Sequence, residues 1–327
     1  MEIRCNTVGD GLAQGLSYIL HHGVEESSRN GPVLAAPEPV LITYRYPKNR
    51  VLFSPLRDAN PFFHFMEAMW MLAGHCDLDW PRHFNSRFVE FSDDGVNLNG
   101  AYGYRWRTYF QRDQLEDAIR ELTTSPYSRR VVIGMWDARR DLNSESKDIP
   151  CNTHIYVDTR DGNVNMTVCN RSNDVLWGTF GANAVHMSFL QEYIACRLCK
   201  PIGVYRQFTN NLHLYTDVLP RERAMHMVLD LKNSEGYSEE NFWVSYPLLR
   251  TRPDFWREDL EKFLRFADPT MDFVDPFFTK IAAPMLMAWQ YRHDELGLTA
   301  ANLIAAPDWR RACCEWIERR RKNAKSS

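Results

Sequence analysis

A short antiparallel hairpin is the sequence feature that most restricts how this chain can fold. Segments 154–159 and 163–170 both have strand character, and only Arg160-Asp161-Gly162 separates them. An Asp-Gly pair in so short a connection is typical of a tight hairpin turn. Two strands joined in this way pair antiparallel, whereas a parallel pair needs a connection of a dozen or more residues. The chain therefore contains a sheet that is not built from parallel strands alone.

The other predicted elements are grouped by type along the chain. The run Val40–Tyr44 reads as a strand, and 129–136 reads as a buried strand. The strongest helix is 60–74, because Asn60 suits an N-cap, Pro61 the first helical position and Gly74 the end. Further helices are predicted at 11–22, 183–199, 254–267, 276–292 and 308–321. Strands and helices that do not alternate strictly favour an α+β fold, in which a mixed sheet packs against helices.

Bulk properties exclude several classes of protein. The 327 residues, of which 44% are hydrophobic, suffice for a large core, and we treat 1–327 as a single domain. The net charge of -3 provides no basic field for nucleic acid or membrane. No apolar run approaches the roughly 20 residues that span a bilayer, so a cytoplasmic protein with reduced cysteines is expected. The pair Cys196 and Cys199 lies in a helical run without a second pair, which favours helix packing over a metal site.

Three clusters of residues carry chemistry. The first is Asp148-Ile149-Pro150-Cys151-Asn152, where a proline holds a cysteine on a stiff segment. The second, Asn170-Arg171-Ser172-Asn173-Asp174, follows the second hairpin strand and so returns close to Cys151. An arginine near a cysteine favours the reactive thiolate, and Arg171 with Ser172 suits a phosphate. The third is Ser128-Arg129-Arg130, whose adjacent arginines point to opposite faces of a strand. Taken singly, each cluster also fits a purely structural role: an inert thiol, a surface turn or a charged strand end.

Together these clusters resemble the thymidylate synthase family. The resemblance extends over about residues 25–220 in order and spacing, while about 250–327 is a divergent helical region. Besides the three clusters and Gly178, it rests on Asn99-Gly100-Ala101-Tyr102-Gly103-Tyr104-Arg105-Trp106-Arg107, on Asn211-Leu212-His213-Leu214-Tyr215 and on Glu67.

The resemblance implies covalent catalysis on a pyrimidine nucleoside monophosphate. Cys151 would attack C6 of the base, which turns the ring into an enolate whose C5 can attack an electrophilic methylene. The cosubstrate 5,10-methylenetetrahydrofolate would supply that methylene, and Asp174 would hold its pterin ring. Glu67 would organise waters and move protons, and Tyr102 would help to remove the C5 proton.

The resemblance also implies ligands for the rest of the nucleotide and a partner subunit. His213 and Tyr215 would bind the sugar hydroxyl. The phosphate would be held by Arg171, Ser172 and Arg29, together with Arg129 and Arg130 from a second subunit. The protein would then be a homodimer formed through its sheet.

Four departures from the synthase pattern bear on the reaction. Asn152 replaces a histidine after the cysteine, and Asn170 replaces a glutamine. The position of the base-reading asparagine falls at Ala182, next to Asn183, and we assign Asn183 and Asn170 to the base. The short apolar tail of the synthases is also missing.

The missing tail and a missing tryptophan affect which product is expected. The tail and an aromatic residue keep water away from the methylene intermediate in synthases, and the segment Asn85-Ser86-Arg87-Phe88 has no tryptophan. A 5-hydroxymethyl product is therefore expected. A helix around Trp309 and Trp316 that replaces the lid would instead favour a true thymidylate synthase. The other alternative is an inactive homologue that binds nucleotides or RNA. Uracil against cytosine and ribose against deoxyribose stay open at this point.

Overall fold

A computed structural model describes residues 1–234, 236–237 and 245–326, with side chains to residue 322. The strands are β1 Glu2–Cys5, β2 Val24–Ser28, β3 Gly31–Ala35, β4 Val40–Tyr44, β5 Val132–Gly134, β6 Asn152–Asp158, β7 Val164–Asn170, β8 Asn173–Asp174, β9 Ile202–Thr209 and β10 Leu212–Tyr215. The α-helices are α1 Val8–His22, α2 Pro61–Ala73, α3 Tyr102–Tyr104, α4 Gln114–Thr124, α5 Asn183–Leu198, α6 Arg221–Asn233, α7 Pro253–Phe266, α8 Ala283–Gln290, α9 Glu295–Asn302 and α10 Pro307–Ser326.

The strands form two sheets. The larger has the order β1-β4-β9-β7-β6-β5, and the smaller has the order β2-β3-β10-β8. Strands β6 and β7 pair antiparallel, from Asn152 opposite Asn170 to Asp158 opposite Asn165, so the predicted hairpin is confirmed. Strand β9 pairs parallel with β7 and antiparallel with β4. The sheet is therefore mixed and the fold is α+β, as predicted.

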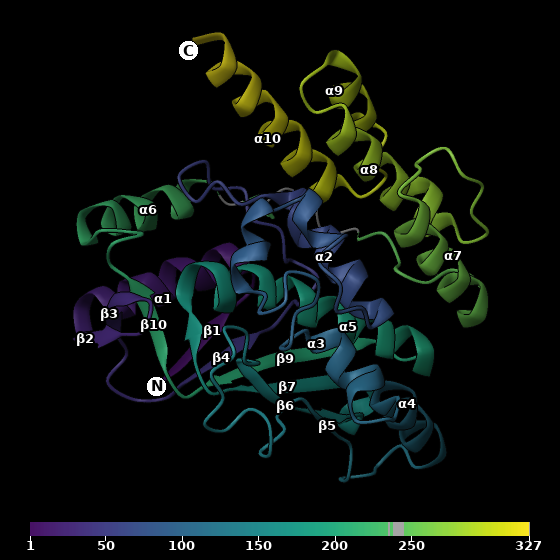
Figure 1. Cartoon of the computed structure of the whole chain (residues 1–327), viewed down its shortest axis with the longest axis horizontal. Helices are drawn as coiled ribbons and strands as arrows, with labels where there is room; N and C mark the ends of the chain where they lie inside the picture. Colours follow the sequence, from purple (N-terminus) through teal and green to yellow (C-terminus); the bar gives the residue numbers. More distant parts are fainter. Residues whose placement is uncertain (235, 238–244, 327) are drawn as a thin grey trace.

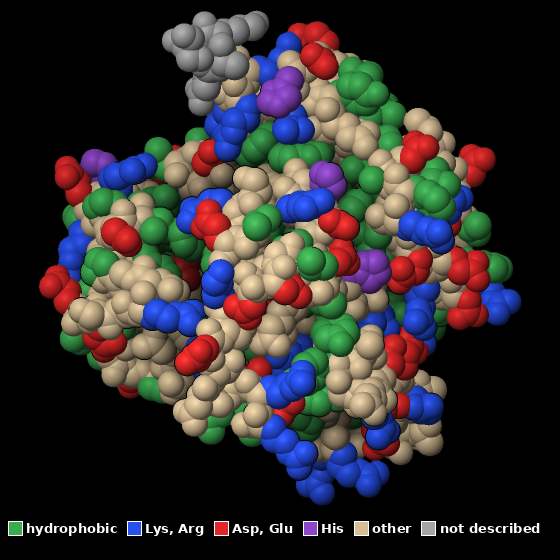
Figure 2. Space-filling model, in the orientation of Figure 1, with side chains coloured by type: hydrophobic (Ala, Val, Ile, Leu, Met, Phe, Trp, Pro, Cys, Tyr) green, Lys and Arg blue, Asp and Glu red, His purple; other side chains and the backbone are tan. Residues whose placement is uncertain are grey.

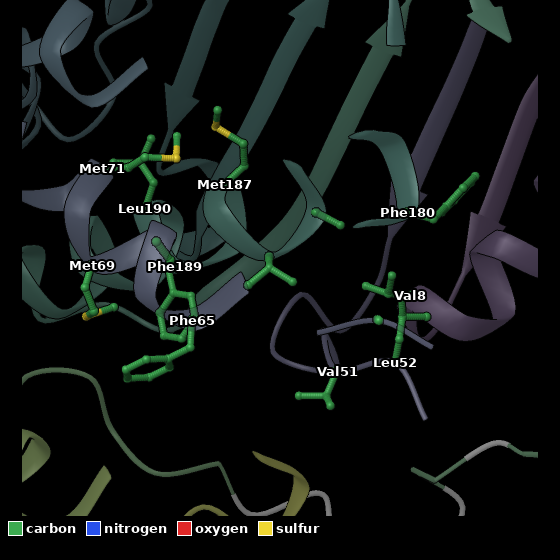
Figure 3. Close-up of a cluster of buried hydrophobic side chains, with 14 of the residues drawn as sticks. Val8, Val51, Leu52, Phe65, Met69, Met71, Phe180, Met187, Phe189 and Leu190 are labelled. Atoms are coloured by element: carbon green, nitrogen blue, oxygen red, sulfur yellow. The ribbon is translucent and has the colours of Figure 1, made fainter. Parts of the chain in front are cut away.

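Helices α1 and α5 cover one face of the large sheet, and α2 lies on α5 (Figure 1). The buried cluster between these layers joins Phe65 of α2 to Phe189 of α5, with ring centroids 5.8 Å apart (Figure 3). Helices α7 to α10 pack outside α2, away from the large sheet (Figure 1). Trp309 packs on Phe65 at 5.5 Å, and Trp316 packs on Phe62 at 5.6 Å. Both tryptophans are thus core residues, which removes the idea that they replace a lid.

The other face of the large sheet carries exposed apolar side chains. Val132, Tyr156 and Phe208 lie on β5, β6 and β9, and their exposed fractions are 47%, 47% and 41%. Acidic and basic side chains are interspersed over most of the face seen in Figure 2. Within the described part of the chain, no helix is both long and apolar enough to cross a bilayer.

Local sequence signals predicted the bounds of some elements correctly and those of others incorrectly. In α2 the side chain of Asn60 accepts from the Phe63 N–H at 3.2 Å, and Gly74 ends the helix at φ 87°, both as predicted. The predicted strand 129–136 shrinks to β5. The reason is that the N–H groups of Met135 and Trp136 both reach the Thr153 carbonyl, beside a bulge, so the ladder cannot continue. The predicted helix 276–292 divides into a π-helical turn, Phe278–Ala282, and α8.

Candidate active site

A cleft of about 1010 Å³ opens where β6, β8 and β10 meet the loop between β2 and β3. A smaller cavity of about 200 Å³ adjoins it beneath α2 and α5. Most of the residues predicted from the sequence line these two cavities: Arg29, Glu67, Tyr102, Cys151, Arg171, Ser172, Asp174, Asn183, His213 and Tyr215. The exceptions are Arg129, Arg130 and Asn170.

Cys151 lies at the junction of the two cavities and is held there by Arg171. The Arg171 guanidinium donates from Nε to the Pro150 carbonyl at 3.0 Å and from Nη2 to the Ile149 carbonyl at 2.9 Å. Its backbone N–H donates to the Cys151 carbonyl at 2.9 Å. Arg171 therefore holds the segment that carries Cys151 in place, a role that the sequence did not suggest.

The ionisation of Cys151 departs from the sequence-based expectation. The positive charges of Arg171 and Arg29 lower the pKa of the thiol, as expected, but burial outweighs them and raises the pKa above its ordinary value. Asp148 adds a further upward contribution to that pKa. In the free protein, the thiol form of Cys151 is therefore favoured.

Tyr102 and Glu67 flank the nucleophile. Burial raises the pKa of Tyr102 well above its ordinary value, although hydrogen bonds from the backbone of Asn152 and Cys151 oppose this shift. The Oε2 atom of Glu67 lies 3.1 Å from Nε2 of His186, which the first turns of α5 place in the smaller cavity. Despite this short distance, neither atom has a hydrogen-bond partner among the described residues.

The residues predicted to bind phosphate that line the cleft are Arg29, Arg171 and Ser172. Arg29, on the turn between β2 and β3, donates to the Lys147 carbonyl at 3.4 Å. In contrast, Arg130 is exposed and pairs with Glu121 at 3.3 Å, and Arg129, also exposed, does not line the cleft of its own chain.

Asp174 lines the cleft, and one of its carboxylate oxygens is unpaired. Its Oδ1 accepts from the N–H groups of Leu176 and Trp177 at 2.8 and 2.6 Å, so it caps the following turn. Its Oδ2 is buried and has no hydrogen-bond partner among the described residues. Burial raises the pKa of Asp174 to about 6. A buried acceptor without a partner is uncommon in proteins, so Asp174 is a candidate ligand-binding residue.

His213 and Tyr215 extend from β10 into the same cleft, where their rings are 5.0 Å apart. Because β10 pairs with β8, His213 lies opposite Asp174. Nδ1 of His213 lies 2.9 Å from the side-chain oxygen of Asn211, which can only accept. The Nδ1 atom therefore carries the proton, and Nε2 is left as an acceptor for a hydroxyl group.

Asn183 lines the larger cleft, whereas Ala182 lines only the smaller cavity. Residues Val175–Ala182 form an irregular π-helical segment, in which Gly181 has non-helical angles. A π-type turn accommodates one extra residue, so the side chain of Asn183 reaches the cleft from the start of α5. A Cβ at Gly178 would lie 1.9 Å from Oδ1 of Asn173, so only glycine leaves space for the amide next to Asn183.

A chain of buried amides fixes the orientation of Asn183. The Thr179 carbonyl accepts from Nε2 of Gln207 at 2.9 Å. Oε1 of Gln207 then accepts from Asn173 at 3.0 Å, and Oδ1 of Asn173 accepts from Nδ2 of Asn183 at 3.1 Å. Because a carbonyl can only accept, each amide in turn has one allowed orientation. The Asn183 amide therefore keeps its NH₂ group toward Asn173.

Asn170 does not reach either cavity, in contrast to its assignment to the base. It is 2% exposed, and its amide donates to Thr209 Oγ1 at 3.3 Å. Asn170 shares the inner face of β7 with Val168, since alternate residues of a strand point the same way. The neighbouring Asn152 is also fully buried, opposite Asn170. We therefore no longer assign Asn170 to the base.

Sequence reasoning missed Asp148, His186, Asn173 and Gln207. His186 follows Asn183 by three residues, a spacing that places both on one face of a helix and that could have identified it. Asp148 lies three residues before Cys151 within a cluster that was singled out for its cysteine. No pattern in the sequence could have identified Gln207, because only the pairing of β9 with β7 and β4 brings it to Asn173.

Comparisons with known proteins agree with this site. The thymidylate synthase family model matches residues 13–231. A deoxyuridylate hydroxymethyltransferase of Pseudomonas phage M6 is 41% identical over 98% of this chain and 94% of its own length. A protein of the same name from Bacillus phage SP01 is 37% identical over 62% of this chain and 55% of its own. A putative thymidylate synthase of Methanothermobacter thermautotrophicus is 26% identical over 65% of this chain and 93% of its own. The chain therefore belongs to the thymidylate synthase family.

Proposed function

We propose that this protein is a deoxyuridylate hydroxymethylase, which converts dUMP to its 5-hydroxymethyl derivative with 5,10-methylenetetrahydrofolate. The observation that carries the proposal is the convergence of Cys151, Tyr102 and Asp174 on one cleft. The name of the phage M6 relative, which is similar over almost the whole chain, supports the choice of substrate and product. A protein that only binds nucleotides or RNA would not need the nucleophile.

Cys151 opens the reaction by adding to C6 of the base. Because burial favours the thiol, the proton of Cys151 must leave as the adduct forms, and the charge of Arg171 beside it stabilises the thiolate. The electron pair moves through C5 onto the O4 oxygen, where the Glu67–His186 pair can supply a proton. C5 then bonds to the methylene carbon of the folate, and Tyr102 assists removal of the C5 proton. The bond between that carbon and the folate nitrogen breaks, which releases tetrahydrofolate and leaves the exocyclic methylene.

The folate supplies the one-carbon unit. Asp174 would hold its pterin ring through the unpaired Oδ2 atom, while Trp177 and Trp136 offer aromatic surface along the cleft. At the other end, Arg29, Arg171 and Ser172 would bind the nucleotide phosphate, and Nε2 of His213 would accept from the sugar hydroxyl together with Tyr215.

The amide chain that ends at Asn183 supports one base over the other. An asparagine can pair with uracil or with cytosine, but only by turning its amide over, since donors and acceptors at positions 3 and 4 are exchanged between the two bases. Asn173 holds the Asn183 amide in one orientation. The site should therefore accept one base, and the names of the phage relatives indicate that it is uracil.

Water, rather than hydride, is expected to complete the reaction. Trp309 and Trp316, the candidates for a substitute lid, are 4% and 6% exposed within the core. Trp177, at the cleft, is 45% exposed. Excluding water from a reactive methylene requires a closed apolar cover, so this open cleft supports the hydroxymethyl product.

The proposed assembly is a homodimer formed through the outer face of the large sheet. The exposed Val132, Tyr156 and Phe208 on that face would be covered by a second subunit. Arg129 and Arg130, which are exposed outside their own cleft, would then contact the phosphate bound by the partner. We place the enzyme in the cytoplasm, consistent with its eight free cysteines.

Product analysis tests the proposal. The enzyme is incubated with 5,10-methylenetetrahydrofolate and dUMP, dCMP, UMP or CMP, and the nucleotides are identified by mass spectrometry. We expect 5-hydroxymethyl-dUMP with tetrahydrofolate. Formation of thymidylate with an equal amount of dihydrofolate would show instead that the protein is a thymidylate synthase.

A further inference from the structure

The two cavities of the active site share a small set of lining residues around Cys151. Residues that line both are Phe91, Tyr102, Asp148, Ile149, Cys151 and Asn183. Among these, Asp148 is the one carboxylate in the described part of the chain. Of the other carboxylates, Glu67 lines only the smaller cavity, and Glu90, Asp141 and Asp174 line only the larger cleft. Asp148 therefore lies at the junction that faces the nucleophile from both sides.

Asp148 is held rigidly but keeps one oxygen available. Its Oδ2 accepts from the Gly100 N–H at 2.7 Å, and its carbonyl accepts from Nδ2 of Asn99 at 2.9 Å. A Cβ at Gly100 would lie 2.8 Å from Oδ1, so glycine permits this close approach. Among the described residues, no hydrogen bond to Oδ1 is found. That atom can accept a proton from a small molecule in the cavity.

The charge of Asp148 is unfavourable for the first step of the reaction. Burial raises the pKa of Asp148 to about 6, so the group is mostly ionised at neutral pH. Its negative charge raises the pKa of both Cys151 and Tyr102, which works against the thiolate. A carboxylate that disfavours the Cys151 thiolate does not assist the first step, so we expect its role in a later step of the reaction.

We propose that Asp148 is the general base that activates the water which attacks the 5-methylene group of the nucleotide. This inference rests on the proposed hydroxymethylase function. The water oxygen forms a bond to the exocyclic carbon, and Oδ1 of Asp148 takes the proton that the water loses. The electron pair of the exocyclic double bond moves into the ring as an enolate. That enolate then restores the C5–C6 double bond and expels Cys151 as the thiolate.

Other titratable groups at the junction fit this role less well. Glu67 lies 3.1 Å from His186 and does not line the larger cleft. Tyr102 is assigned to the earlier removal of the C5 proton, and burial raises its pKa well above its ordinary value. Asp148 is a base of suitable strength next to the nucleophile, and a positioned general base accelerates a step by about 10²- to 10⁴-fold.

The variant Asp148→Asn tests the proposal, because the amide oxygen can still accept from Gly100. Release of tritium from [5-³H]dUMP reports steps up to loss of the C5 proton, and mass spectrometry reports hydroxymethyl product. In a single turnover, with enzyme in excess of dUMP, we expect the rate of tritium release to stay within a few-fold of wild type. The ratio of the rate of product formation to the rate of tritium release should fall about 100-fold, because the methylene adduct stays on Cys151. Added 2-mercaptoethanol should trap the missing fraction as a 5-thioether nucleotide.

Asp93→Asn serves as the matched control. Asp93 is an exposed carboxylate that accepts from the Lys147 N–H at 3.0 Å in the same loop, but it lines neither cavity. We expect this variant to keep the wild-type ratio. The dUMP Kd of each variant, measured by calorimetry, verifies that the site is folded.

The outcomes separate the two proposals. A ratio that stays at the wild-type value in Asp148→Asn, or an equal fall in tritium release and product, would overturn the role of Asp148 while the hydroxymethylase assignment stands. Wild-type enzyme that makes thymidylate would overturn the proposed function itself, and with it the need for a water-activating base.

Discussion

Replacing Asp174 separates its structural role from its binding role, because its two oxygens do different work. Oδ1 caps the turn that follows, and Oδ2 is buried and unpaired at the cleft. Asn keeps the capping oxygen but turns the free atom from an acceptor into a donor. Ala removes both, and loss of a cap lowers the free energy of unfolding by about 0.5–2 kcal/mol.

The expected magnitude for Asp174→Asn follows from the lost charge-assisted hydrogen bond. Such a bond contributes about 1.5–3 kcal/mol, and each 1.36 kcal/mol corresponds to about tenfold in affinity. The folate KM should therefore rise about 10- to 150-fold at saturating dUMP, while the dUMP Kd stays near the wild-type value. In urea, Asp174→Asn should unfold at or above the wild-type midpoint, because burial disfavours the charged form that it removes.

The pH dependence of the folate KM provides a second test of Asp174. Burial raises the pKa of Asp174 to about 6, so the carboxylate becomes protonated as the pH falls through that value. The wild-type folate KM should rise below about pH 6, and this dependence should be absent in Asp174→Asn. If dUMP binding weakens as much as folate binding, or if the folate KM does not change, Asp174 does not hold the pterin ring.

Three further predictions address the nucleophile, the assembly and the base. Cys151→Ser should abolish turnover and leave dUMP binding nearly intact, as measured by calorimetry; unchanged kcat would refute covalent catalysis. Mixing Arg130→Ala with Cys151→Ser should restore part of the activity, because one hybrid site would be wild type, whereas a stable active monomer in sedimentation would exclude shared sites. Asn173→Leu should lower the kcat/KM preference for dUMP over dCMP about fivefold, since one hydrogen bond of about 1 kcal/mol no longer orients Asn183; an unchanged preference would show that the amide chain does not select the base.

The sequence alone determined the features that depend on neighbouring residues. Helix α2 begins after Asn60 and ends before Gly74, since caps act within one turn. The hairpin of β6 and β7 followed from a tight turn, and it brought Arg171 to Cys151. The chemistry of the nucleophile was likewise readable from a motif of a few residues.

Only the tertiary structure decided what depends on distant residues and on burial. Asn183 rather than Ala182 reaches the cleft because an irregular π-helical segment shifts the register by one residue, and local propensity does not report such a shift. Burial outweighs the nearby arginines in setting the pKa of Cys151, and burial is a property of the packed chain. Asn173 finds its partner on β9 because sheet pairing joins residues that are far apart in sequence. Composition and spacing identify which groups are present, but desolvation and long-range pairing determine what each group can do.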